Sequence, residues 1–302
     1  MTFVEFLQKF KKPIIITSGS LLALAGVLYF MPVEEQQKNN QQKENNSKEE
    51  QSIEELRNSQ RFQRDGKPLS PEEEQQKIDA IAQTLQLKRA LQSDIKLEYN
   101  DNGLLSLNSI KVIQHRSVMI GLKKLMSVHE ELIKIRQSKY DDLLLFFQLT
   151  NKLYEFYFQT LNSSLLTVVT LLEVNEELFT KSKQYYEQTQ QLRPNYLRDI
   201  TWHFMAEELS KKQMTIDEYA NYLQIQIDNI PEQLELINKD EKLKAIDPKA
   251  KKLFINGRVD DYAFQKTGFS DCDAIKALRE NSKDERIAKL LQQRTETLGN
   301  CC

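Results

Sequence analysis

Glycine and proline are scarce along this chain, with only eight glycines and seven prolines among its 302 residues. Average usage would give about 12% for the two types together, so turns that depend on them are few. A sheet protein needs a turn every ~8–12 residues, and a βαβ fold needs glycine-rich loops at its strand ends. The shortage therefore predicts an all-α protein built from long helices.

The charged side chains are nearly balanced, with 42 basic and 44 acidic residues and a formal net charge of −2. Because a nucleic-acid-binding surface needs a basic excess, no nucleic-acid partner is expected. Three cysteines are too few for a disulfide-stapled scaffold. The sequence also contains no Walker loop, GxSxG or GxGxxG motif. We therefore expect a protein that is not an enzyme and that carries no cofactor.

The longest uncharged run contains the 18 residues from Ile14 to Met31, which lie between Pro13 and Pro32. As a helix these 18 residues would span ~27 Å, close to the ~30 Å hydrocarbon core of a bilayer. The apolar region of a cleaved signal peptide is usually only ~7–15 residues long and is followed by a cleavage site of small residues, whereas this run is longer and ends at Phe30, Met31 and Pro32. We therefore interpret residues 13–32 as a single, retained transmembrane helix, with a cleaved signal peptide as the alternative.

Small residues in this run share one helix face, because Gly19, Ala23 and Gly26 follow i, i+4, i+7 spacing. Such a face lets another transmembrane helix approach closely. Residues 1–12 form a short basic N-terminus, which the positive-inside tendency places on the cytoplasmic or matrix side. Its mixture of basic and apolar residues also fits an uncleaved mitochondrial import signal.

Residues 33–52 are expected to form a polar tether. From Glu34 to Ser52 there is no apolar side chain to offset the entropy of ordering the backbone. The organisation predicted after the tether is a long-helix domain over 53–193 and a C-terminal lobe of short helices over 194–302.

Helix start and stop signals divide the long-helix domain. Ser70 and Glu73 form a capping box with proline between them, so a helix begins there. Asn100–Gly103 interrupts the helical pattern. Antiparallel helices are then expected from about Leu107 to Lys139 and from about Leu143 to Leu192. Because the first half of the second helix is apolar on nearly every face, we expect it to lie in the core.

In the C-terminal lobe, capping boxes are predicted at Thr215 with Glu218 and at Ser282 with Glu285. Gly257 and Gly268 are expected C-terminal stops. The short helices predicted from these signals are about Tyr196–Leu209, Ile216–Asn229, Glu232–Lys244, Pro248–Ile255, Cys272–Arg279 and Glu285–Leu298.

One stripe in the helix after Leu107 alternates three- and four-residue steps, as in a short coiled-coil seam: Leu122, Leu125, His129, Leu132 and Arg136. Within it, His129 is interpreted as a satisfied core or seam residue. None of the three histidines is grouped with cysteines or in an HExxH pattern, so no metal site is predicted.

The segment from Glu98 to Ser109 resembles a degenerate EF-hand loop. Aligned on Gly103, its Glu98, Asn100 and Asn102 fall at the first, third and fifth ligand positions. The twelfth position, which should supply a bidentate carboxylate, holds Ser109. We therefore expect a helix-turn-helix corner that binds no calcium.

The sequence ends in Cys301 and Cys302. This ending resembles the geranylgeranylated termini of Rab-type GTPases and makes both cysteines candidates for lipidation. Lipidation requires a cytosolic terminus, which is opposite to the orientation favoured by the basic N-terminus. The other interpretation is a pair of exposed free thiols.

These features of the sequence are consistent with two alternative functions. The first is a non-catalytic accessory subunit of a large membrane complex, such as a protist mitochondrial respiratory-chain or ATP-synthase assembly, with other subunits and the lipid bilayer as partners. Richness in Asn, Gln and Lys is typical of AT-rich protist genomes, and the import-like N-terminus favours the mitochondrial inner membrane. The alternative is a freestanding single-pass tether or receptor on an ER or peroxisomal membrane, whose helices bind a partner protein.

Overall fold

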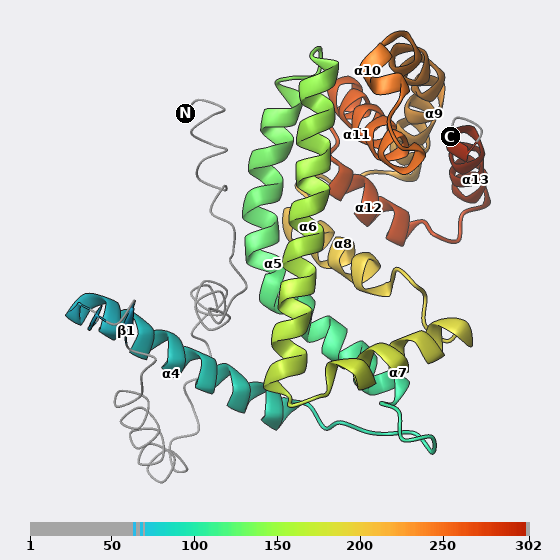
Figure 1. The fold of residues 1–302 in the computed structure, drawn as a ribbon. Helices are drawn as coiled ribbons and strands as arrows, with labels where there is room; N and C mark the ends of the chain where they lie inside the picture. Colours follow the sequence, from blue (N-terminus) through green and yellow to red (C-terminus); the bar gives the residue numbers. More distant parts are fainter. Residues whose placement is uncertain (1–62, 65–66, 69, 300–302) are drawn as a thin grey trace. The chain divides into compact units, whose positions relative to one another are not determined.

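The computed structural model describes residues 63–64, 67–68 and 70–299 (Figure 1). Most of these residues lie in helices, which confirms the all-α fold class. The only strands in this part of the chain are β1 (Gln63–Arg64) and β2 (Lys67–Pro68), which pair antiparallel. The transmembrane helix predicted over 13–32, its small-residue face, the tether and the terminal cysteines lie outside the described residues.

Ten helices follow within the described residues. They are α4 (Pro71–Asp94), α5 (Leu107–Gln137), α6 (Leu143–Leu171), α7 (Glu176–Gln188), α8 (Tyr196–Leu209), α9 (Ile216–Lys239), α10 (Glu241–Lys244), α11 (Pro248–Thr267), α12 (Asp271–Glu280) and α13 (Glu285–Gly299). Among them, none has both the length and the apolar character that crossing a membrane requires.

The predicted capping boxes begin two of these helices. At the start of α4, the Glu73 backbone N–H donates to the Ser70 hydroxyl, and the Ser70 N–H donates to the Glu73 carboxylate. Thr215 and Glu218 make the same exchange at the start of α9. The box predicted at Ser282 is wrong, because the Asp284 carboxylate instead accepts the backbone N–H groups of Arg286 and Ile287 in the first turn of α13.

The single helix predicted from Leu143 to Leu192 is two helices. Glu173 adopts a left-handed conformation with φ of 58°, which ends α6. The Asn175 side-chain oxygen then accepts the Leu178 N–H at 3.1 Å and starts α7. Neither glycine nor proline marks this break, so the sequence pattern alone predicts a continuous helix.

Two breaks predicted in the C-terminal lobe are also wrong. Pro231 lies inside α9 and Gly257 inside α11, so these helices have 24 and 20 residues instead of being short. Proline removes one backbone donor, but Ile230 and Ile237 on either side are fully buried, and this packing keeps the helix continuous. The stop predicted at Gly268 is confirmed, since this residue caps α11 in a left-handed conformation.

The chain divides into two compact units. The first contains the described residues up to Arg116 together with Leu166–Tyr186, and the second contains Ser117–Leu165 and the chain from Glu187 onward. The domain boundary expected between residues 193 and 194 stays a prediction.

In the first unit, the segment that resembles an EF-hand is a closed corner. The Asn100 side-chain oxygen accepts the N–H groups of Asn102 and Leu104, both at 3.0 Å. The Ser109 hydroxyl accepts the Glu98 N–H at 2.8 Å. Two oxygens that a calcium ion would need are therefore engaged by the backbone of the corner itself, which agrees with the interpretation as a helix-turn-helix corner.

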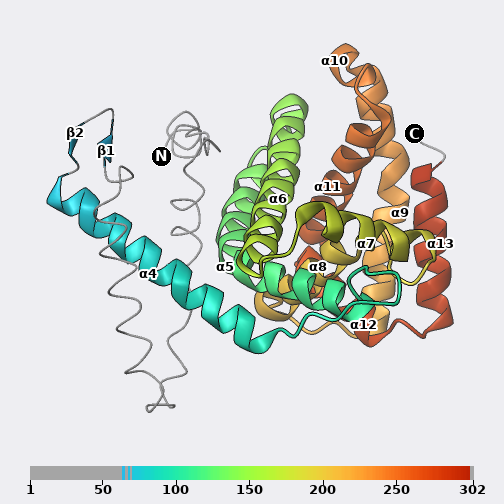
Figure 2. The ribbon, with the colours of Figure 1, turned by 60° about the horizontal axis from the view of Figure 1, so that its bottom comes forward.

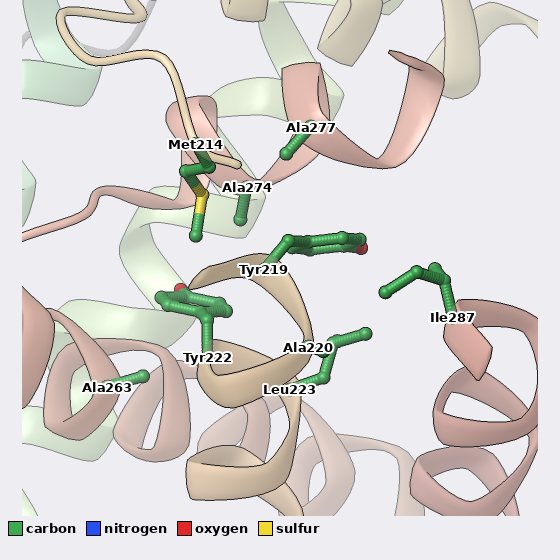
Figure 3. Close-up of a cluster of buried hydrophobic side chains, with 9 residues drawn as sticks. All are labelled: Met214, Tyr219, Ala220, Tyr222, Leu223, Ala263, Ala274, Ala277 and Ile287. Carbon is green, nitrogen blue, oxygen red and sulfur yellow. The ribbon is translucent and has the colours of Figure 1, made fainter. Parts of the chain in front are cut away.

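In the second unit, the parts of α5 and α6 that belong to it run side by side and are joined by the turn at 138–142 (Figures 1 and 2). Helix α9 packs against α10, α11, α12 and α13, and α8 packs against α12. Figure 3 shows Tyr219 and Tyr222 of α9 near Ala274 of α12. Because alanine is small, α12 can lie close to these rings.

Helix α6 supplies part of the core, as its apolar sequence predicts. Phe146, Leu149 and Leu153 on one side of the helix are buried, whereas Leu144 is 37% exposed. Phe146 also packs edge-on against Phe254 of α11, with the ring centroids 5.6 Å apart.

We predict that Leu149→Asp lowers the free energy of unfolding by about 3–5 kcal/mol, because it places a carboxylate without a partner where Leu149 is 1% exposed. Urea unfolding followed by circular dichroism measures this change. Leu144→Asp on the same helix is the control and should cost less than about 1 kcal/mol. Equal losses for both variants would show that this side of α6 is not part of the core.

Candidate functional site

The stripe predicted on α5 is buried along its length, at Leu122, Leu125, His129, Leu132 and Arg136. The coiled-coil geometry expected for it stays a prediction. Its two polar members are seven residues apart, so they lie on one face of the helix two turns from each other. Both side chains contact the C-terminal helices of the second unit, and they define the candidate site.

Arg136 forms a buried, bidentate ion pair with Asp261 of α11. Its Nε and Nη2 atoms donate to the two carboxylate oxygens at 2.9 and 2.8 Å, and Gln137 donates to the same carboxylate at 3.2 Å. Only 6% and 3% of the two side chains are exposed. Burial disfavours the guanidinium charge, but the Asp261 carboxylate outweighs burial and raises the pKa of Arg136. The pair is therefore a charged link between α5 and α11.

The Arg136 guanidinium packs so close to α11 that residue 257 has no room for a larger side chain than that of glycine. A Cβ atom at residue 257 would lie 3.1 Å from Arg136 Nη1 and 3.4 Å from Thr150 Oγ1. That is closer than most side-chain carbons approach such groups. The glycine that the sequence indicates as a helix stop thus makes room for an arginine from another helix.

His129 lies in an aromatic pocket. Its Nδ1 atom forms a hydrogen bond with the Tyr157 hydroxyl of α6. The Trp202 ring of α8 meets the imidazole edge-on, with ring centroids 5.9 Å apart. Trp202 thus packs as the aromatic anchor of this region, and the imidazole is held with its Nε2 atom pointing away from Tyr157.

The first turn of α12 faces that Nε2 atom. Asp271 Oδ1 lies 3.7 Å from it and Cys272 Sγ lies 3.9 Å from it. The three possible ligand atoms of these residues all lie within 4.8 Å of one another. A histidine nitrogen, a carboxylate oxygen and a sulfur therefore converge from two helices.

The position of this turn is fixed by Asp273. Its Oδ2 atom accepts the Ser270 N–H and hydroxyl, which completes a capping box at the start of α12. Its Oδ1 atom accepts the backbone N–H groups of Lys211 and Lys212 at 2.8 and 2.9 Å. One carboxylate thus holds both the start of α12 and the loop after α8.

A cavity of about 340 Å³ opens beside these groups. His129, Asp271 and Cys272 line it together with Arg136, Asp260 and Asp261. At its edge, Lys211 pairs with Glu130 at 2.8 Å, which links the loop after α8 to α5. The volume is sufficient for water or a small ligand.

The pKa values of Asp271 and Cys272 are shifted in opposite directions. Burial works against the Asp271 carboxylate, but interactions with His129 and Arg136 outweigh it and lower the pKa of Asp271. Burial and the neighbouring Asp271 and Asp273 carboxylates raise the pKa of the Cys272 thiol. A catalytic cysteine needs the opposite shift, so this thiol is not an activated nucleophile.

The sequence places His129 in a buried stripe correctly but gives no sign of its neighbours. His129 and Cys272 are 143 residues apart, and no short motif connects them. The one local signal is the Ser270–Asp273 box, which fixes where α12 begins.

The Gly19, Ala23 and Gly26 face and the Cys301–Cys302 pair lie outside the described residues. No protein-family model, curated protein or solved structure matches this chain.

Asp260, in the cavity wall, gives the site a pH dependence. Although 31% of its side chain is exposed, the partial burial of Asp260 raises its pKa to about 6, against the opposing charge of Arg294. Its carboxylate accepts a hydrogen bond from Gln226 at 2.7 Å. Because the folded pKa lies above the ordinary value of 3.8, the folded state holds the extra proton between about pH 4 and 6, and stability falls as pH rises through this range.

We predict that Asp260→Asn removes this loss, so that the stability of the variant relative to wild type rises by about 2 kcal/mol from pH 4 to pH 7. Urea unfolding at several pH values between these limits measures the difference. Asp228→Asn is the control, since Asp228 is exposed and also accepts a hydrogen bond from a glutamine, Gln224. Parallel pH profiles for Asp260→Asn and wild type would contradict the prediction.

Proposed function

We propose that this chain is a non-catalytic accessory subunit of a large membrane complex, anchored by the helix predicted over 13–32. The proposed location is the mitochondrial inner membrane. Its partners in this proposal are the lipid bilayer and other subunits, one of which contacts α6 around Phe158.

The observation that carries the proposal is the exposed side of α6. Phe158 is 69% exposed and Leu144 is 37% exposed, although α6 is the most apolar of the long helices. They are 14 residues apart and about 40° from each other around the helix axis, with the polar residues Gln148 and Glu155 exposed between them, so Phe158 is the main apolar feature of this side. Exposed aromatic side chains of this kind are typical of protein–protein contact sites.

The buried polar groups of the second unit favour a structural function as well. Arg136 forms an ion pair with Asp261. The Arg258 guanidinium lies 3.9 Å from the centre of the Tyr140 ring and donates a hydrogen bond to the Tyr140 carbonyl. These charges hold helices together. In addition, the small-residue face of the predicted span fits contact with another transmembrane helix.

We predict that Phe158→Asp releases the protein from its complex without unfolding it. The tagged full chain is expressed in its natural host, extracted with mild detergent and separated on a native gel. Wild type should migrate with an assembly of many subunits, and Phe158→Asp should migrate mostly as a small species. The purified variant should keep the thermal stability of wild type, because the side chain is already exposed.

The matched control is Gln159→Asp, which introduces the same charge at the adjacent exposed residue of α6 and should leave the assembly intact. A small species for wild type would contradict the accessory-subunit proposal and favour a freestanding tether or receptor. Release from the membrane by an alkaline carbonate wash would contradict the anchor. An unchanged assembly with Phe158→Asp would show that this side of α6 is not the contact.

A further inference from the structure

The convergence of His129, Asp271 and Cys272 has the geometry of a metal site. In tetrahedral zinc sites the bonds to nitrogen, oxygen and sulfur are ~2.0–2.3 Å long, which places the nitrogen ~3.3 Å from an oxygen and ~3.5 Å from a sulfur. The corresponding distances here, from His129 Nε2, are 3.7 and 3.9 Å. The three ligand atoms lie within 4.8 Å of one another, so coordination requires side-chain rotations that draw them together, and Asp271 Oδ1 also accepts the Cys272 backbone N–H at 2.8 Å.

The imidazole is oriented as a metal ligand requires. When Nδ1–H donates to the Tyr157 hydroxyl, Nε2 presents its lone pair toward the other two groups. Metal-binding histidines almost always have such a partner on the second ring nitrogen, which fixes the tautomer and the ring. Trp202 and Tyr157 pack around the ring and limit its rotation.

The chemistry of the three groups selects the ion. A sulfur and an imidazole favour zinc over magnesium or calcium, which prefer oxygen ligands. One thiolate and one carboxylate supply two negative charges, which balance a divalent cation. The cation would also promote loss of the thiol proton, which burial otherwise retains. The adjacent cavity leaves room for water as the fourth ligand.

We propose that His129, Asp271 and Cys272 bind a zinc ion that ties α5 to the first turn of α12. This site is independent of the contact proposed on α6. It revises the expectation of no metal that the sequence alone gives, because the ligands come from segments that only the fold brings together.

The test uses the full chain with Cys301→Ser and Cys302→Ser, because the terminal thiols could bind metal themselves. The metal-free protein is titrated with Co²⁺ and with Zn²⁺. We expect a sulfur-to-cobalt charge-transfer band with tetrahedral visible bands, displacement of cobalt by one equivalent of zinc, and a rise in melting temperature with zinc.

Cys272→Ser should abolish the charge-transfer band and weaken zinc binding by at least ~100-fold, and Tyr157→Phe should weaken it by ~10-fold while keeping the band. His203→Gln, which removes a histidine of α8 outside the cluster, is the control and should bind like the parent. Circular dichroism of the metal-free Cys272→Ser protein checks that it is folded. Absence of the band in the parent, or zinc binding as tight in Cys272→Ser as in the parent, would overturn the proposal and leave a thiol–imidazole contact without metal.

Discussion

The second unit depends on one buried ion pair, between Arg136 of α5 and Asp261 of α11. A buried charge is tolerated only when it is paired and hydrogen-bonded, and here both carboxylate oxygens accept from the guanidinium. The two residues are 125 positions apart in the sequence. The pair therefore fixes how the long helices of the unit meet its C-terminal helices, and Gly257 provides the space for it.

The candidate site follows from this constraint. Because Arg136 fixes one face of α5, His129 on the same face is held toward the first turn of α12. Asp273 holds that turn from the other side through the loop after α8. The ligand atoms of His129, Asp271 and Cys272 converge because both helices that carry them are fixed independently, which is the arrangement that a preformed metal site needs.

Local signals in the sequence predict local structure well. The capping boxes at Ser70 and Thr215 begin helices where expected, and α8 has the bounds that the sequence predicts. A side-chain cap acts within a few residues, so its effect can be read from the sequence. The buried stripe on α5 could also be predicted, because its spacing matches the helical period.

The predictions that were wrong concern features that depend on tertiary packing. Pro231 and Gly257 are helix breakers by propensity, but burial of their neighbours and the approach of Arg136 outweigh a local cost of about 1–3 kcal/mol. The end of α6 near Glu173 is not marked by a glycine or a proline in the sequence. The cluster around His129 could not be predicted, since its members lie on separate helices and only the fold joins them.

A double-mutant cycle on the buried pair tests the account most directly. If Arg136 and Asp261 hold the unit together, Arg136→Met and Asp261→Leu should each lower the free energy of unfolding by about 3–5 kcal/mol, and the double variant should lose much less than the sum. The exposed Lys88–Glu173 pair is the control and should show no measurable coupling, because solvent screens the two charges. Additive losses at Arg136 and Asp261 would contradict the account.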